Sequence, residues 1–77
     1  MTDKELIELA ATDDAAAFRL AVQLGLMIEQ DYTGVPCVRV AENKIDEPTV
    51  KERHGDDPCA ATRKAIVRAA LNLMGRN

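Results

Sequence analysis

Apolar residues recur at helical spacing most clearly over residues 58–74, and the sequence carries a signal for each end of this predicted helix. Asp57 precedes a proline, which keeps it extended and able to cap, and Pro58 suits the first helical position. Gly75 offers a left-handed stop. The helix would be roughly 25 Å long, enough to span a small domain. Its apolar stripe consists of Cys59, Ile66, Ala70 and Leu73, flanked by Val67, Leu71 and Met74.

The first third of the chain predicts further helix. Thr2 and Glu5 have the spacing of a capping box, which opens a helix over residues 3–11. The run Thr12-Asp13-Asp14 supplies a second N-cap signal, so that either a new helix begins here or one long helix kinks. The helical pattern covers residues 13–24 and stops at Gly25. We expect its core side to hold Phe18, Ala21 and Val22, with Ala17, Leu20 and Leu24 beside them, and its solvent side to hold Ala16, Arg19 and Gln23.

Three strands are predicted between Gly25 and the last helix. Residues 26–29 are short and half apolar, residues 35–42 alternate around Val38 and Val40, and residues 49–53 alternate as a mostly exposed third strand. Pro36 cannot donate to a ladder and therefore lies at a sheet edge or at the strand start. Residues 43–48 form a polar loop.

The predicted order is α-(α)-β-β-β-α, in a single domain over residues 1–77. Short loops favour an antiparallel sheet with both major helices on one face, which is a small two-layer α+β domain. If Val38, Val40 and Val50 point to the helices, the opposite sheet face is partly polar and open to self-association, so we expect a homodimer. That face would carry Cys37, Arg39, Thr49, Lys51 and Arg53.

Composition limits the classes of function. A chain of 77 residues with 47% apolar residues can fold, but its core is small. The net charge of −3 argues against nucleic-acid binding by bulk electrostatics. The N-terminus has no long apolar run, so we expect neither a signal peptide nor a membrane anchor, and a soluble, intracellular protein. Two cysteines without a CxxC motif predict two reduced, packed thiols.

Candidate chemistry is sparse. His54, Asp56, Asp57 and Cys59 lie close in sequence and could be written as a metal site, or Cys59 and His54 as a nucleophile pair. Structural roles explain the same residues without a metal site or a nucleophile: Asp57 caps the helix, His54 lies in a surface turn and Cys59 is a packed thiol. No phosphate loop, GxSxG or HExxH motif is present. We therefore expect no catalytic residue, no metal and no cofactor: the protein is not predicted to be an enzyme.

Basic side chains are the remaining candidates for contact with a partner. The last helix carries Arg63, Lys64 and Arg68, and the outer sheet face is predicted to carry Arg39, Lys51 and Arg53. They fit a solvated surface, or a contact surface for an acidic protein or RNA. The order α-β-β-β-α is also that of double-stranded RNA-binding domains, but Asp56 and Asp57 stand where such domains place basic residues at the start of the last helix.

Several segments resemble small proteins of tailed phages and prophages, related in pattern to the nin-region proteins of lambdoid phages and to the phage α/β/α sandwich domain. The segments are GDDPCAATRKAIVRAA at 55–70, TDD at 12–14, AFRLAVQLG at 17–25 and the opening residues 2–11. Relatives usually carry an extra segment, often with Trp, between the first helix and the TDD motif. Here Ala11 directly precedes Thr12.

The resemblance implies a phage or prophage origin, a two-layer helix–sheet fold and action in the cytoplasm of a bacterial host, and it transfers no catalytic residue. Our leading hypothesis is a non-catalytic accessory protein that binds a host or phage macromolecule, most simply a protein. It would act as an inhibitor or adaptor, a class that includes antagonists of host defence. The alternative is an RNA- or DNA-binding module.

Overall fold

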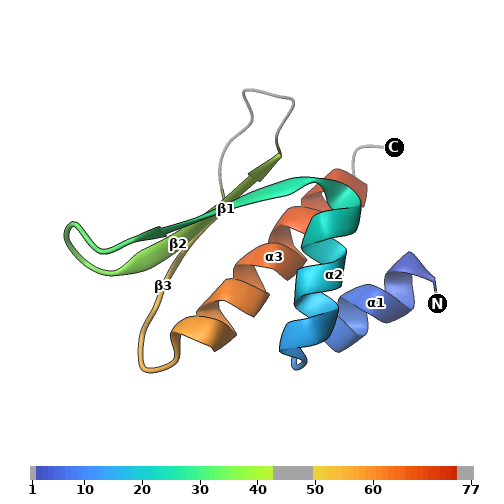
Figure 1. The fold of residues 1–77 in the computed structure, drawn as a ribbon, viewed down its shortest axis with the longest axis horizontal. Coiled ribbons are helices and arrows are strands. Elements are labelled where there is room, and N and C mark those ends of the chain that lie inside the picture. Colours follow the sequence, from blue (N-terminus) through green and yellow to red (C-terminus); the bar gives the residue numbers. More distant parts are fainter. Residues whose placement is uncertain (1, 43–49, 75–77) are drawn as a thin grey trace.

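The computed structural model describes residues 2–42 and 50–74 as three helices and a three-stranded sheet (Figure 1). The elements, in chain order, are α1 (Asp3–Ala10), α2 (Asp14–Leu24), β1 (Leu26–Asp31), β2 (Cys37–Glu42), β3 (Val50–Arg53) and α3 (Pro58–Met74). The predicted α+β class and the order α-α-β-β-β-α are confirmed. The predicted loop over 43–48, the position of Thr49 and the stop at Gly75 lie outside the described residues.

Local capping chemistry fixes the helix starts. Thr2 and Glu5 form the predicted capping box on α1. Asp13 accepts a hydrogen bond from the Ala15 N–H, so a new helix begins there and the alternative of one kinked helix is wrong. Gly25 ends α2 with a φ of 65°, in the left-handed region that glycine adopts at little cost.

The three strands form an antiparallel sheet in the order β1-β2-β3, so β1 and β3 are its edges. The first strand extends to Asp31, two residues beyond its predicted end, because Asp31 pairs with Cys37 on β2. The middle strand begins at Cys37 instead of residue 35. The helix α3 runs along one face of this sheet, α2 joins β1 directly, and α1 packs against α2 and α3 (Figure 1).

The register assigns the side chains to two faces. Ile28, Val40 and Val50 form one row across the three strands on the helix side, and Val40 and Val50 are buried. Glu29, Arg39 and Lys51 form a row on the open side. The predicted division of the sheet into an apolar face toward the helices and a partly polar open face is thus confirmed for its described residues.

The core is built largely from alanine. Small side chains let helices approach one another closely, and alanine accounts for about half of this core. The buried apolar cluster consists of Leu6, Ile7, Ala10, Ala16, Ala17, Leu20, Ala21, Val38, Val40, Val50, Ala61, Ala65, Ile66, Ala69 and Ala70.

Two predicted helix faces are partly wrong. Phe18 and Val22 are 69% and 65% exposed, whereas Ala16, expected to face solvent, is buried. The buried side of α2 is therefore rotated toward its alanines, which fit the close contacts with the other helices. Leu71, placed in the apolar stripe of α3, is also exposed.

Candidate functional site

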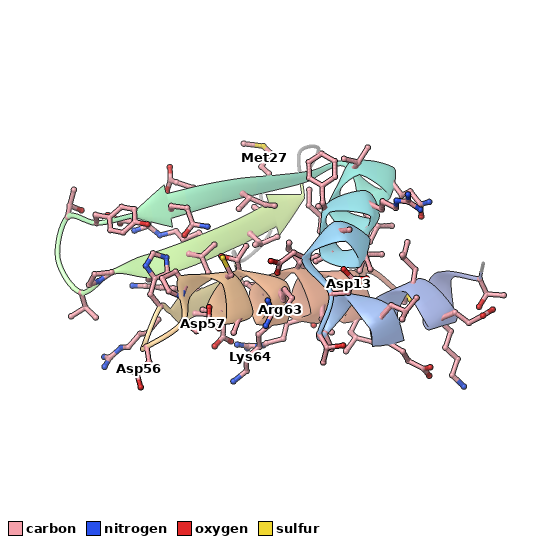
Figure 2. All side chains as sticks on the ribbon, turned by 60° about the horizontal axis from the view of Figure 1, so that its bottom comes forward. Asp13, Met27, Asp56, Asp57, Arg63 and Lys64 are labelled. Carbon is pink, nitrogen blue, oxygen red and sulfur yellow. The ribbon has the colours of Figure 1, made fainter. Side chains whose placement is uncertain are left out.

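Four basic side chains gather around the edge strand β3, and we refer to Lys51, Arg53, Lys64 and Arg68 as the β3 basic surface. Lys51 and Arg53 alternate with Glu52 along β3 and therefore lie on the open face. Their Cα atoms are roughly 7 Å apart, two residues along a strand. Lys64 and Arg68 come from α3 on the other side of the strand. Figure 2 shows Lys64 projecting outward from α3.

Glu52 connects the two sides of this surface. Its Oε1 lies 3.7 Å from Lys64 Nζ, and its Oε2 accepts a hydrogen bond from Arg68 Nη1. The Glu52 side chain is largely buried, whereas those of Lys64 and Arg68 are exposed. One carboxylate thus offsets part of the charge of two basic residues, and the helix-side half of the surface keeps a positive balance.

Lys51 and Arg53 form no ion pair with any residue in the described ranges 2–42 and 50–74. Both are exposed, and they line a hollow of about 310 Å³ on the open face of the sheet. The rest of its lining comes from the β1–β2 connection and from the strands beside it: Asp31, Thr33, Gly34, Val35 and Cys37. The carboxylates of the described residues thus leave these two cations to a ligand at this edge.

Arg39, another predicted contact residue, is held within the molecule. Its Nη1 donates to Glu29 and its Nη2 to Asp31, both over 2.5 Å. The hydrogen bond to Glu29 and the charge of Asp31 raise the pKa of Arg39. In turn, hydrogen bonds from the Thr33 hydroxyl and N–H, together with Arg39, lower the pKa of Asp31 to about 2. Arg39 therefore offsets one of the two carboxylates, and the cluster of Glu29, Asp31 and Arg39 keeps a net negative charge over β1.

Arg63 is next to Lys64 on α3, but its side chain contacts the α1–α2 junction instead of β3. Its Nη1 donates to Asp14 over 2.6 Å and its Nε to the Ala11 carbonyl oxygen over 3.3 Å. The hydrogen bond with Asp14 raises the pKa of Arg63. The structure therefore places Arg63 between α3 and the α1–α2 junction, while its role in binding a partner stays a prediction.

His54 was expected on the surface, but it is buried, with 5% of its area exposed. Its Nε2 lies 2.5 Å from Oε1 of Gln30, and its ring lies 5.1 Å from that of Tyr32. Gln30 also donates to Thr62 Oγ1 over 2.9 Å, which donates to the Pro58 carbonyl oxygen. The histidine thus ties the turn before α3 to β1, a contact between distant segments that no local sequence pattern indicates.

The two cysteines differ. Cys37 is buried, as predicted, whereas Cys59 is exposed, which corrects the expectation of a packed thiol. Asp57 accepts hydrogen bonds from the N–H groups of Cys59 and Ala60, which confirms it as the cap of α3. Within the described residues, no three His, Cys, Asp or Glu side chains are grouped as a metal site would require.

An apolar cleft of about 400 Å³ lies between α2, β1 and α3, and sequence reasoning missed it. Its apolar lining includes Phe18 from α2, Ile28 from β1 and Ile66 from α3. The sequence pattern places Phe18 in the core and Ile28 in a strand, and neither signal indicates that these side chains stay exposed. The exposure of Cys59 has the same origin, because its side chain lines this cleft.

Comparison of the chain with protein-family models, with curated proteins and with solved structures found no match. Among the described helices, none has the length and apolar character needed to cross a membrane.

Proposed function

We propose that this protein is a non-catalytic binding module that recognises an acidic surface of another protein through its β3 basic surface. In keeping with the family resemblance, we propose a phage-encoded accessory protein that acts on a host or phage protein in the bacterial cytoplasm. It would act as an inhibitor or adaptor, and its targets would include host-defence proteins. We further propose that it works as a homodimer.

The observation that carries this proposal is the difference between two groups of basic side chains. Arg39 and Arg63 are held by carboxylates at 2.5–2.6 Å within the molecule. Lys51 and Arg53 are exposed on an edge strand and have no acidic partner among the described residues. Two adjacent cations on one strand can pair with carboxylates of a partner without first breaking an ion pair to a described residue.

The form of β3 adds to this proposal. As a sheet edge it leaves every second backbone N–H and C=O facing outward, so a partner can combine ion pairs with backbone hydrogen bonds. The overall charge of −3 shows that the positive surface is local, and a local charge of sign opposite to the rest favours oriented association.

Binding of RNA or DNA is the second candidate, because α2, the three strands and α3 follow one another in the order found in double-stranded RNA-binding domains, and both of these helices contact the sheet. Phosphate contacts by Lys51, Arg53, Lys64 and Arg68 would supply its affinity. Asp56 and Asp57, exposed at the start of α3, oppose a phosphate backbone there (Figure 2). We therefore rank a protein partner first.

Capture from a lysate of the bacterial host, with and without nuclease, separates the two candidates. A protein recovered equally in both samples supports the proposal. Recovery of RNA-associated proteins that disappears with nuclease, together with gel shifts of structured RNA or duplex DNA, would replace it. Absence of a shift at about 50 mM salt, where phosphate contacts are strong, would eliminate the nucleic-acid candidate.

A further inference from the structure

The edge strand β1 is less covered by the helices than its neighbours. Ile28 lies opposite Val40 in the ladder and on the same face, yet Ile28 is 41% exposed and Val40 is fully buried. The helix α3 covers β2 and β3 and leaves the helix side of β1 open to the cleft. Because β1 is an edge, its outward N–H and C=O groups also have no ladder partner among the described strands.

Exposed apolar side chains on α2 border this uncovered strand. Phe18 and Val22 are one helical turn apart and therefore neighbours on the surface of α2. Phe18 lines the cleft together with Ile28. An apolar cleft beside an unpaired strand edge can bury both its side chains and its backbone groups against an added strand.

The opposite face of β1 restricts what that added strand can be. Met27, Glu29 and Asp31 lie on the open side, and Figure 2 shows Met27 pointing away from the helices. Two carboxylates along a short strand disfavour a partner that places acidic residues directly across from them. This condition distinguishes between the registers in which β1 can pair with a second copy of itself.

We propose that β1 of a second copy pairs antiparallel with β1 around a two-fold axis at Ile28, which joins the two sheets into one of six strands. This register pairs every residue from Leu26 to Gln30. It sets Ile28 against the partner's Ile28, Leu26 against the partner's Gln30, and Glu29 against the partner's Met27. Apolar side chains thus meet beside the cleft, and no carboxylate faces another.

Shifted registers either place carboxylates opposite each other or pair fewer residues. An axis at Glu29 sets that carboxylate against its own copy, and an axis at Gln30 sets Asp31 against the partner's Glu29. An axis at Met27 avoids both clashes but pairs fewer strand residues. A chain of 77 residues also has a small core of its own, so burial of Phe18 and Ile28 between two copies adds apolar area where it is scarce.

This inference rests on the proposed homodimer and specifies its interface; it does not use Lys51 or Arg53. One cysteine at a time replaces Met27, Ile28 or Glu29 in a Cys59→Ser background that keeps the buried Cys37, and mild oxidation with diamide reports the register. Residues at the axis have Cα atoms about 4.5–5.5 Å apart, within the range of a disulfide. Copies of either neighbouring residue lie about 7–8 Å apart across the ladder, which is too far.

We expect Ile28→Cys to form a disulfide-linked dimer and Met27→Cys and Glu29→Cys to remain largely uncrosslinked. Crosslinking at Met27 or Glu29 in place of Ile28 would overturn the register. No crosslink at any of the three, with a dimer in sedimentation, would overturn the β1 interface and leave the homodimer standing. A monomer at high micromolar concentration would overturn both.

A second variant tests the same interface without oxidation. Ile28→Asp places like charges directly opposite each other at the axis, while the site is partly open in the single chain. We expect the dimer dissociation constant to rise at least about 100-fold, with an unchanged far-ultraviolet circular dichroism spectrum. A folded variant that dimerises as tightly as wild type would contradict the proposal.

Discussion

Arg63 on α3 donates a hydrogen bond from Nη1 to Oδ1 of Asp14, the first residue of α2, over 2.6 Å. The same guanidinium reaches the carbonyl oxygen of Ala11, just after α1. One side chain thus joins the last helix to the junction of the first two. This contact spans 49 residues of sequence and helps to fix how the three helices lie together.

Arg63→Ala removes both contacts, and we expect the melting temperature to fall by a few degrees relative to wild type. Arg19→Ala is the matched control, because Arg19 is exposed on α2 and forms no ion pair with a described residue. Thermal unfolding followed by circular dichroism measures both. Equal melting temperatures for the two variants would show that Arg63 does not hold the helices together.

Asp57→Ala removes the cap of α3, since Asp57 accepts hydrogen bonds from Cys59 and Ala60 at 3.1 Å. We expect the free energy of unfolding to fall by about 1 kcal/mol. Asp56→Ala deletes the same charge one residue earlier, where no such bond is made, and should change stability by less than about 0.5 kcal/mol. Urea denaturation compares the two, and equal losses would indicate a charge effect instead of a cap.

Gln30→Ala leaves His54 without its hydrogen-bond partner in a buried position. An unsatisfied buried group costs about 1–3 kcal/mol, and we expect a loss of stability in this range. Gln23→Ala, which removes an exposed glutamine from α2, should be nearly neutral. Urea denaturation again decides: if the Gln30 variant is as stable as the Gln23 variant, the connection between His54 and β1 is not stabilising.

The order of elements could be predicted from the sequence because local groups determine it. The box formed by Thr2 and Glu5, the N-cap signal in the run Thr12-Asp13-Asp14 and the left-handed Gly25 all act within a few residues, and each marks a helix end that the structure shows. Alternation around Val38 and Val40 likewise identified the middle strand, which is buried on one face. These signals need no knowledge of distant parts of the chain.

The surface around the site could not be predicted in the same way, because it depends on contacts between distant segments. His54 is buried by Gln30 and Tyr32, which lie more than 20 residues earlier. Phe18 was assigned to the core on periodicity, but alanines such as Ala16 occupy the close helix contacts and displace it outward. The sequence shows which residues are basic but not which of them form ion pairs. The pairs with Glu52, Asp14, Glu29 and Asp31 appear only in the folded chain.

Acid should weaken the fold partly through Asp31. Its pKa is lowered from 3.8 to about 2, chiefly by the Thr33 hydroxyl and N–H, so the folded state favours the charged carboxylate. The resulting stabilisation is fully present above the unfolded pKa and is lost as the pH falls from about 4 through 2. We expect Asp31→Asn to melt below wild type near neutral pH and the difference to vanish toward pH 2. A difference independent of pH would show that the Asp31 charge does not contribute.

The proposed binding function is tested most directly by reversing charge at Lys51 and Arg53 together. Lys51→Glu/Arg53→Glu is compared with Lys4→Glu/Arg19→Glu, which makes the same change in net charge on α1 and α2. All four residues are exposed, so both variants should keep the wild-type melting temperature to within a few degrees.

The decisive measurement is the amount of the nuclease-resistant protein partner that each variant recovers from host lysate. We predict that the Lys51/Arg53 variant recovers none above background, whereas the Lys4/Arg19 variant recovers as much as wild type. Equal recovery by both variants would contradict recognition through the β3 basic surface.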